Sequence, residues 1–271
     1  MPTDDTPPKP EKIRAPEWAL QPFRDFLDYT DHLGGVVDLS VRSLSLIPHV
    51  PEAVKALAMA EDSEQADDTK RSLDIANKQA EFAQQEISAG FPFLHNQAAV
   101  SLWSALESLL HTCVSQWILN RPEILQQEPL ANVRLKIGDY VALDQEQQAY
   151  YLADMLEQSL AAPLKSGITR FEAVFTALGL GGCIDPSTRQ TLYELQQVRN
   201  VVLHKRGIAD QKFCMACPWL NIKPGTHVAV SQKMLDAYFA AAGHYIVELI
   251  YRTGEFFGVP GMRAKAEAAT T

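Results

Sequence analysis

This sequence has few cysteines, no long apolar runs and no excess of basic residues. Its 271 residues include only four cysteines, Cys113, Cys183, Cys214 and Cys217. So few cysteines in a chain of this length do not make a disulfide framework. No apolar run approaches the roughly 20 residues needed to cross a bilayer, and the first ten residues lack the apolar core of a signal peptide. These absences predict a cytoplasmic protein with reduced thiols.

The charge balance is acidic, with 33 Asp and Glu against 24 Lys and Arg and a formal net charge of −9. A protein that coats nucleic acid needs an excess of basic residues, so this balance argues against that class. A nuclease is still compatible with it, because a local basic cleft is enough to hold a few phosphates.

What the sequence does contain is helical periodicity. The composition, 46% hydrophobic and 21% charged, is that of a globular protein with a sizeable core. Apolar residues recur at spacings of three and four, and Gly or Pro interrupts the pattern. The sequence therefore predicts an all-α fold. Helices are expected over residues 17–33, 36–47, from 51, 73–87, 95–120, 144–162, 168–178, 186–206 and after Ser231.

Two segments are expected to be irregular. Ile137–Asp139 contains Gly138 and is predicted to form a turn. Lys212–Val230 contains two prolines and Gly225, which favours a short irregular hairpin before the last helix.

The predicted domain organisation has a boundary at Gly90-Phe91-Pro92. Residues 1–16 form a tail, 17–90 an N-terminal helical region, 91–258 a helical bundle and 259–271 a second tail. In the N-terminal region, a stripe of mostly small residues repeats at helical spacing: Leu73, Ala76, Ala80, Ala83 and Ile87. This stripe either packs within its own domain or contacts a second chain. Asp74 and Lys78 are expected to form an i,i+4 pair.

The helix predicted at 186–206 has the clearest end signals in the chain. Asp185 fits as its N-cap and Pro186 as its first residue. Gly207 fits just beyond its C-terminal end, where basic residues face the negative pole of the helix dipole. Its predicted apolar stripe is Leu192, Leu195, Val198 and Val202, and its last-turn basic residues are His204, Lys205 and Arg206.

Within this helix lies the motif Arg199-Asn200-Val201-Val202-Leu203-His204, followed by Lys-Arg-Gly-Ile-Ala-Asp. The motif resembles that of the HEPN family (higher eukaryotes and prokaryotes nucleotide-binding domains), over roughly Phe91 to Phe257. The resemblance implies an HEPN-like up-and-down helical bundle. Many members are metal-independent endoribonucleases that act as homodimers, with the Arg and His of two facing helices lining one cleft.

The resemblance also implies roles for individual residues. His204 would exchange protons with the ribose 2′-OH and the leaving 5′-oxygen, because histidine titrates near neutral pH. Arg199 would hold the phosphate, and Asn200 would orient the histidine or bind a phosphate oxygen. Lys205 and Arg206 would contact the RNA backbone, or else would simply be solvated charges at a helix end. The expected products carry a 2′,3′-cyclic phosphate and a 5′-hydroxyl.

Without the resemblance, the residues support a structural interpretation. Asn200 and His204 share a helix face, whereas Arg199 and His204 are separated by about 140° around the axis. Arg199 would then be an anchor at the edge of the core and His204 a surface residue. Glu107 lies in the apolar stretch Leu102–Leu110 and either pairs with Arg199 or points outward.

The alternative function is a non-catalytic HEPN-like module that binds a nucleotide or a protein. The family is associated with stress responses, toxin–antitoxin systems and phage defence, and an antitoxin or another protein partner would bind at the N-terminal helices. No cofactor and no membrane partner is expected.

The remaining motif is Cys214-Met-Ala-Cys217, which has the spacing of a zinc-binding pair. A zinc site needs a second pair, and the sequence offers only single candidates in Cys113, Cys183, His204 and His227. No metal is therefore expected.

Overall fold

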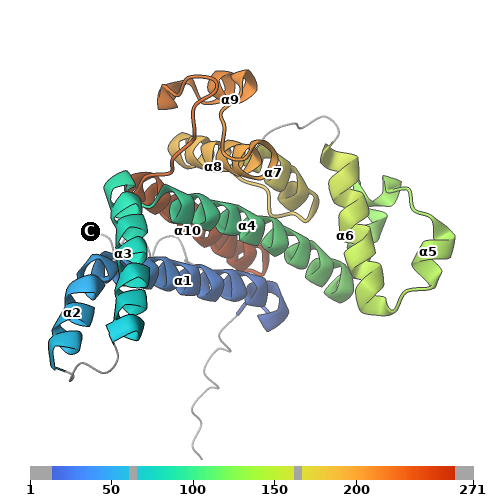
Figure 1. The fold of residues 1–271 in the computed structure, drawn as a ribbon. Coiled ribbons are helices and arrows are strands. Elements are labelled where there is room, and N and C mark those ends of the chain that lie inside the picture. Colours follow the sequence, from blue (N-terminus) through green and yellow to red (C-terminus); the bar gives the residue numbers. More distant parts are fainter. Residues whose placement is uncertain (1–13, 61–65, 162–166, 260–271) are drawn as a thin grey trace, which may run out of the picture. The chain divides into compact units, whose positions relative to one another are not determined.

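The structure, a computed structural model, describes residues 14–60, 66–161 and 167–259. These residues form helices joined by connecting segments (Figure 1). Their only β feature is an isolated antiparallel bridge between Ile208 and His227. The predicted all-α fold is confirmed. No described helix is both long and apolar enough to cross a membrane. The predicted tails lie almost entirely outside the described residues.

The α-helices are α1 (Glu17–Leu46), α2 (Val50–Ala60), α3 (Ala66–Ala89), α4 (Pro92–Asn120), α5 (Ile137–Val141), α6 (Gln145–Ala161), α7 (Ile168–Ala177), α8 (Pro186–Lys205), α9 (Gln211–Ala216) and α10 (Gln232–Phe256). Short 3-10 helices occupy Ile47–His49 (η1), Pro122–Gln126 (η2), Leu130–Asn132 (η3) and Pro218–Leu220 (η4).

Two compact units divide the chain by its internal contacts. Unit 1 comprises Met1–Asp25, Ser108–Asp185 and Gly243–Thr271, and unit 2 comprises Phe26–Glu107 and Pro186–Ala242. The boundary predicted near residue 90 does not coincide with this division. The reason is that α1, α4 and α10 each contribute one part to unit 1 and another to unit 2.

Helix α1 is longer than predicted, since the expected stop at Gly34-Gly35 does not occur. Neither glycine has a positive φ. A glycine inside a helix costs only about 1 kcal/mol relative to alanine. The stripe of Phe26, Leu33 and Val37 passes through this point with its side chains buried or half-buried, so packing outweighs the weak local signal.

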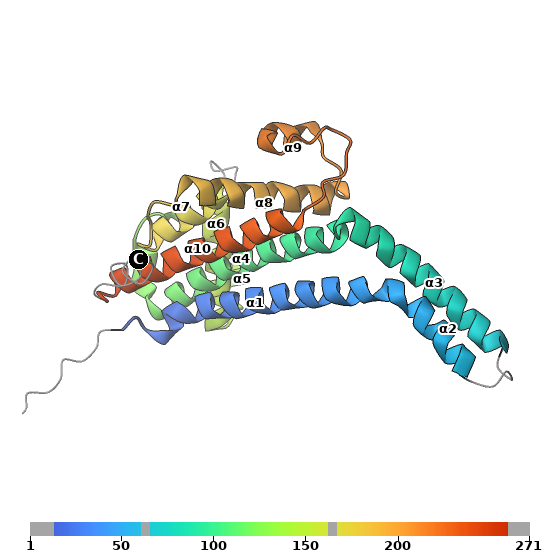
Figure 2. The same ribbon diagram turned by 90° about the vertical axis from the view of Figure 1, so that its left-hand side faces the viewer.

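In unit 2, α2 and α3 run side by side as a helical hairpin (Figure 2). Ala76 and Ala83 of the predicted α3 stripe are buried, and its other three members are half-buried. This arrangement agrees with the first alternative, a stripe that packs within its own chain. The pair predicted between Asp74 and Lys78 is absent from the ion pairs of the described residues.

Two irregular segments contain helix that the sequence did not predict. Ile137–Asp139, expected as a turn, lies in the short helix α5, which spans Ile137–Val141. The predicted hairpin begins with α9, because Asp210 caps this helix by accepting a hydrogen bond from the Phe213 N–H at 2.8 Å. The hairpin character is limited to the pairing near Ile208 and His227.

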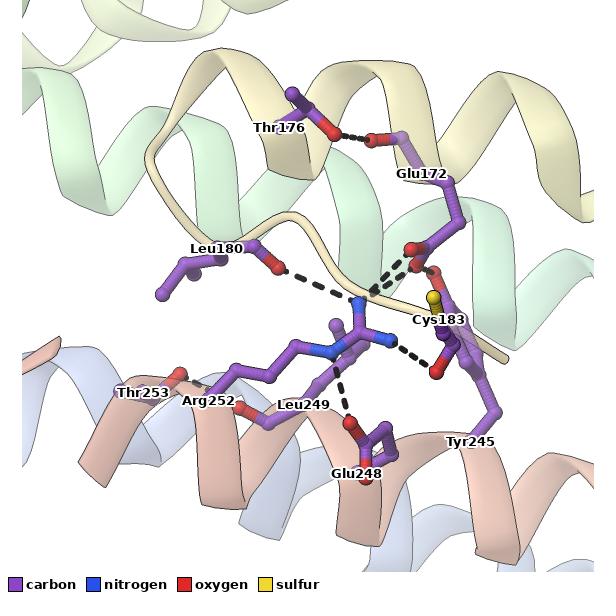
Figure 3. Close-up of polar contacts among 9 residues, drawn as sticks. All are labelled: Glu172, Thr176, Leu180, Cys183, Tyr245, Glu248, Leu249, Arg252 and Thr253. Carbon is purple, nitrogen blue, oxygen red and sulfur yellow. Dashed lines mark hydrogen bonds and ion pairs between the residues drawn. The ribbon is translucent and has the colours of Figure 1, made fainter. Parts of the chain in front are cut away.

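A buried arginine organises unit 1. The Arg252 side chain on α10 is 4% exposed and donates from Nη1 to both carboxylate oxygens of Glu172 on α7, at 3.0 and 2.8 Å (Figure 3). Its Nε donates to Glu248 at 3.0 Å. These hydrogen bonds join α7 to the second half of α10.

The same guanidinium fixes the connection between α7 and α8 (Figure 3). Arg252 donates to the backbone carbonyls of Leu180 and Cys183 at 3.3 and 3.1 Å. Gly182 fits beside it because a Cβ there would lie 2.4 Å from the arginine Nε. The connection that leads into α8 is therefore held by a side chain far away in sequence.

Candidate functional site

Helix α8 has the ends that its sequence predicts. It begins at Pro186, and it ends at Lys205, followed by Arg206 and Gly207 with left-handed φ values of 54° and 77°. Leu192, Leu195 and Val198 are buried as expected. In the last turns, Val201 is buried and Val202 only half-buried, so the apolar stripe shifts by one residue from the prediction.

A polar pocket of about 380 Å³ lies along the C-terminal half of α8. Its wall on α8 comprises Gln197, Asn200, Val201, His204 and Lys205, and its opposite wall comprises Asp210, Lys212 and Phe213. We call it the Asn200–His204 pocket. Two lysines face a single aspartate in its lining, so the pocket is locally basic in an acidic chain. Such a surface attracts a phosphate or another small anion.

The opposite wall follows a tight reversal of the chain. The Ala209 N–H donates to the Thr226 carbonyl at 2.9 Å, and the Val228 N–H donates to the Gly207 carbonyl at 2.7 Å. Asp210 then caps α9, which brings Lys212 and Phe213 to the pocket. Lys205 Nζ lies 3.9 Å from Asp210 Oδ2, a weak ion pair across the pocket.

The returning segment of this reversal is anchored on α4. The Asn96 side chain donates to the Val228 carbonyl at 2.9 Å and accepts from the Val230 N–H at 3.0 Å. His95 is buried, and its Nδ1 lies 3.1 Å from the Val230 carbonyl oxygen. These contacts hold residues 228–230 on α4. Because the reversal pairs this segment with residues 207–209, the pocket wall that follows is held in place as well.

A second anchor is Glu194 on α8. Its carboxylate accepts hydrogen bonds from Trp219 Nε1 and from the Tyr238 hydroxyl, the latter at 2.7 Å. Burial and the neighbouring Glu194 charge raise the pKa of Tyr238 well above its ordinary value. Tyr238 therefore stays a neutral hydrogen-bond donor, and the segment after α9 is held against α8.

Arg199 is not part of the pocket lining. Its Nη2 donates to Glu107 Oε2 on α4 at 3.1 Å, and its Nη1 donates to Asn200 Oδ1 at 3.2 Å. Of the two alternatives for Glu107, pairing with Arg199 is the one observed. The chain of contacts from Glu107 through Arg199 orients the Asn200 amide, so that its N–H groups remain as donors for the pocket.

The structure thus brings together part of the predicted set. Asn200, His204 and Lys205 share one pocket, and Arg199 with Glu107 forms a support behind Asn200. Arg206 is exposed beyond the end of α8 and does not line the pocket.

Five lining residues were not among the predicted site residues: Gln197, Val201, Asp210, Lys212 and Phe213. Gln197 precedes Asn200 by three residues and His204 by seven, a spacing that the sequence displays and that places all three on one helix face. Lys212 had no comparable signal, because its position depends on the reversal after Gly207.

The cysteine pair does not form part of a larger ligand cluster. In the described ranges, no group of three or more His, Cys, Asp and Glu side chains lies together as a possible metal site. Cys217 is buried and Cys214 half-buried.

Comparison of the chain with models of known protein families, with curated proteins and with solved structures finds no match.

Proposed function

We propose that the Asn200–His204 pocket is the cleavage site of a metal-independent endoribonuclease. The observation that carries the proposal is the pocket lining itself. A histidine, an oriented amide and two lysines surround a space of about 380 Å³, large enough for a phosphodiester and part of its ribose. The motif that resembles the HEPN family supplies three of these residues, Asn200, His204 and Lys205.

In the proposed reaction, His204 accepts the proton of a ribose 2′-OH, and the 2′-oxygen attacks the adjacent phosphorus. The bond from phosphorus to the 5′-oxygen breaks, and that oxygen takes up a proton from an acid such as protonated histidine. The products are a 2′,3′-cyclic phosphate and a 5′-hydroxyl. Lys205, Lys212 and the Asn200 amide stabilise the negative charge that builds on the phosphate oxygens.

Arg199 has a different role in this scheme from the one implied by the resemblance. Because Glu107 and Asn200 engage its guanidinium, we assign it as a positioning residue within one chain. Direct contact with the phosphate would require a second copy whose α8 faces the pocket. Such a homodimer, with one cleft shared by two chains, belongs to the proposal and would place α8 near a two-fold axis.

The experiment is incubation of labelled RNA with the protein in EDTA. Wild type should cleave and leave a cyclic phosphate end, and His204→Ala should not. His244→Ala, which removes an exposed histidine from α10, is the matched control and should keep full activity. A substrate with one 2′-deoxyribose should resist cleavage at that position. Full cleavage by His204→Ala would contradict the proposal.

The competing function is a non-catalytic module that binds a nucleotide or a protein. The Glu107–Arg199 pair favours it, because an arginine committed to a carboxylate is a structural anchor. RNA or nucleotide binding without cleavage, weakened by Lys212→Ala and by Lys205→Ala, would support this alternative.

A further inference from the structure

Helix α3 presents a ridge made of Lys78 and Phe82, which are exposed, and Glu86, which is half-buried. These residues are four apart, so they follow one line along the helix surface. The Phe82 ring is 61% exposed. Lys78 is exposed, and among the described residues no carboxylate lies within ion-pair distance of it. A cation, an aromatic ring and an anion thus follow one another along α3, and in the part of the chain that the structure describes neither charge forms an ion pair.

The ridge borders an apolar groove of about 830 Å³ in unit 2. Its lining comes from the end of α1 with η1, the end of α3 and the start of α4: Leu39, Ser40, Ser43, Leu44, Ile47, Phe82, Glu86, Phe93, Leu94 and Gln97. Glu86 is the only charged residue in this lining, and within the described ranges it forms no ion pair. The occupant should therefore be apolar and carry one cation.

The exposure of the lining decides what kind of occupant fits. Small-ligand sites enclose most of the ligand surface, whereas Leu39, Phe82 and Phe93 are 65%, 61% and 70% exposed. A small molecule in this groove would remain in contact with water. A helix would cover it, because Leu39 and Ser43 of α1 and Ile47 of η1 extend along about 12 Å.

We propose that the occupant is α3 of a second copy of this chain, packed antiparallel with Phe82 on a two-fold axis. In a two-fold contact, residues equally far on either side of the axis face one another. Lys78 and Glu86 are each four residues from Phe82, about 6 Å along the helix. Lys78 of each copy therefore faces Glu86 of the other, and the two Phe82 rings meet between the grooves.

This arrangement gives partners to Lys78, Phe82 and Glu86. The cation required beside Glu86 is the Lys78 side chain of the second copy. Ile75, which is 57% exposed and seven residues before Phe82, then lies over the end of the other α3, next to Phe93. The contact is independent of the proposed ribonuclease function, and it uses a different surface from the α8 contact of that proposal.

The test is charge exchange across the axis. Lys78→Glu and Glu86→Lys should each weaken self-association at least about tenfold, because both symmetry-related pairs change sign together. Mixing the two variants should restore a dimer, since each copy then supplies the charge that the other lacks. Glu81→Lys makes the same charge change on an exposed neighbouring face of α3 and is the matched control, with association expected to be unchanged. Sedimentation velocity over a concentration series measures the wild type, the three variants and the mixture, and circular dichroism checks that each variant is folded.

A wild-type chain that stays monomeric at micromolar concentration would overturn the proposal. So would unchanged association of Lys78→Glu, or two monomeric variants that fail to associate when mixed. A wild-type dimer that Lys78→Glu converts to monomers would support the α3 contact and would count against the α8 homodimer, while the cleavage assay would still test the Asn200–His204 pocket within one chain.

Discussion

Replacing Arg199 by methionine removes the cation of the Glu107–Arg199 pair and keeps a flexible side chain. The pair joins α4 to α8 at 3.1 Å, with side chains that are 23% exposed for Arg199 and 30% for Glu107. Exposed pairs contribute about 0–1 kcal/mol, whereas breaking a buried pair costs about 3–5 kcal/mol. At this intermediate burial, we expect Arg199→Met to lower the free energy of unfolding by about 1–3 kcal/mol.

Two other variants of the same chain provide reference values for this loss in free energy of unfolding. Arg252→Met removes a cation that is 4% exposed from a carboxylate partner that is 13% exposed, so its cost should be about 3–5 kcal/mol. His204→Ala removes an exposed side chain at the end of α8, where loss of a favourable interaction with the helix dipole costs at most about 1 kcal/mol. The expected order of destabilisation is Arg252, then Arg199, then His204.

Urea unfolding of the three variants measures this order. A double-mutant cycle with Glu107→Gln isolates the pair, and its coupling energy should be about 1 kcal/mol. A neutral Arg199→Met, or a His204→Ala that costs more than Arg199→Met, would show that the Glu107–Arg199 pair does not stabilise the fold. In an RNA cleavage assay, Arg199→Met should lose activity because the Asn200 amide is no longer oriented. His204→Ala should lose activity with little loss of stability.

Two further predictions concern buried titratable groups. Tyr238 and Tyr245 have pKa values raised above the ordinary 10.0, chiefly by burial, so the folded chain keeps protons that the unfolded chain releases. Their contribution to stability is fully present below pH 10 and is lost as the pH rises above it. Tyrosinate absorbance should show both rings un-ionised until the chain unfolds. Ordinary titration of either ring in the folded protein would contradict this. Burial, followed by the charges of Glu194 and Cys214, raises the pKa of Cys217 to about 12. A thiol-alkylating reagent should therefore modify exposed Cys183 much faster than Cys217 in the native chain, as peptide mass mapping would show, and equal rates would contradict the burial.

Local signals predicted the helix that carries the site. Pro186 fits the first turn, where the missing N–H has no cost, and Gly207 adopts the positive φ that a helix end requires. The shared face of Asn200 and His204 follows from the helical repeat alone, so these residues were expected on one side, and they line one pocket.

The Glu107–Arg199 contact was only half predictable. A glutamate in the apolar stretch of α4 needs a partner or must face water. The sequence could name the partner but could not choose between the two outcomes, because the choice depends on how α4 and α8 pack. The two residues are 92 positions apart, and their pairing is settled by the tertiary fold.

Where local and long-range effects compete, the sequence alone gave the wrong result. Gly34 and Gly35 carry a weak preference against helix, and the apolar stripe on either side of them carries a stronger preference for continuous packing. The segment after Gly207 behaves similarly. Asp210 starts a short helix there, in a stretch whose prolines indicated irregular structure.

The sequence by itself determined the all-α class, the bounds of α8 and the face that Asn200 and His204 share, because these depend on residues within a few turns of one another. The tertiary structure alone decided the opposite wall of the pocket and the position of Arg199. Lys212 reaches the pocket only because the chain reverses between Gly207 and Val228 and is held on α4 through Asn96. Such contacts join residues far apart in sequence, and their free energy is gained only when the whole unit packs.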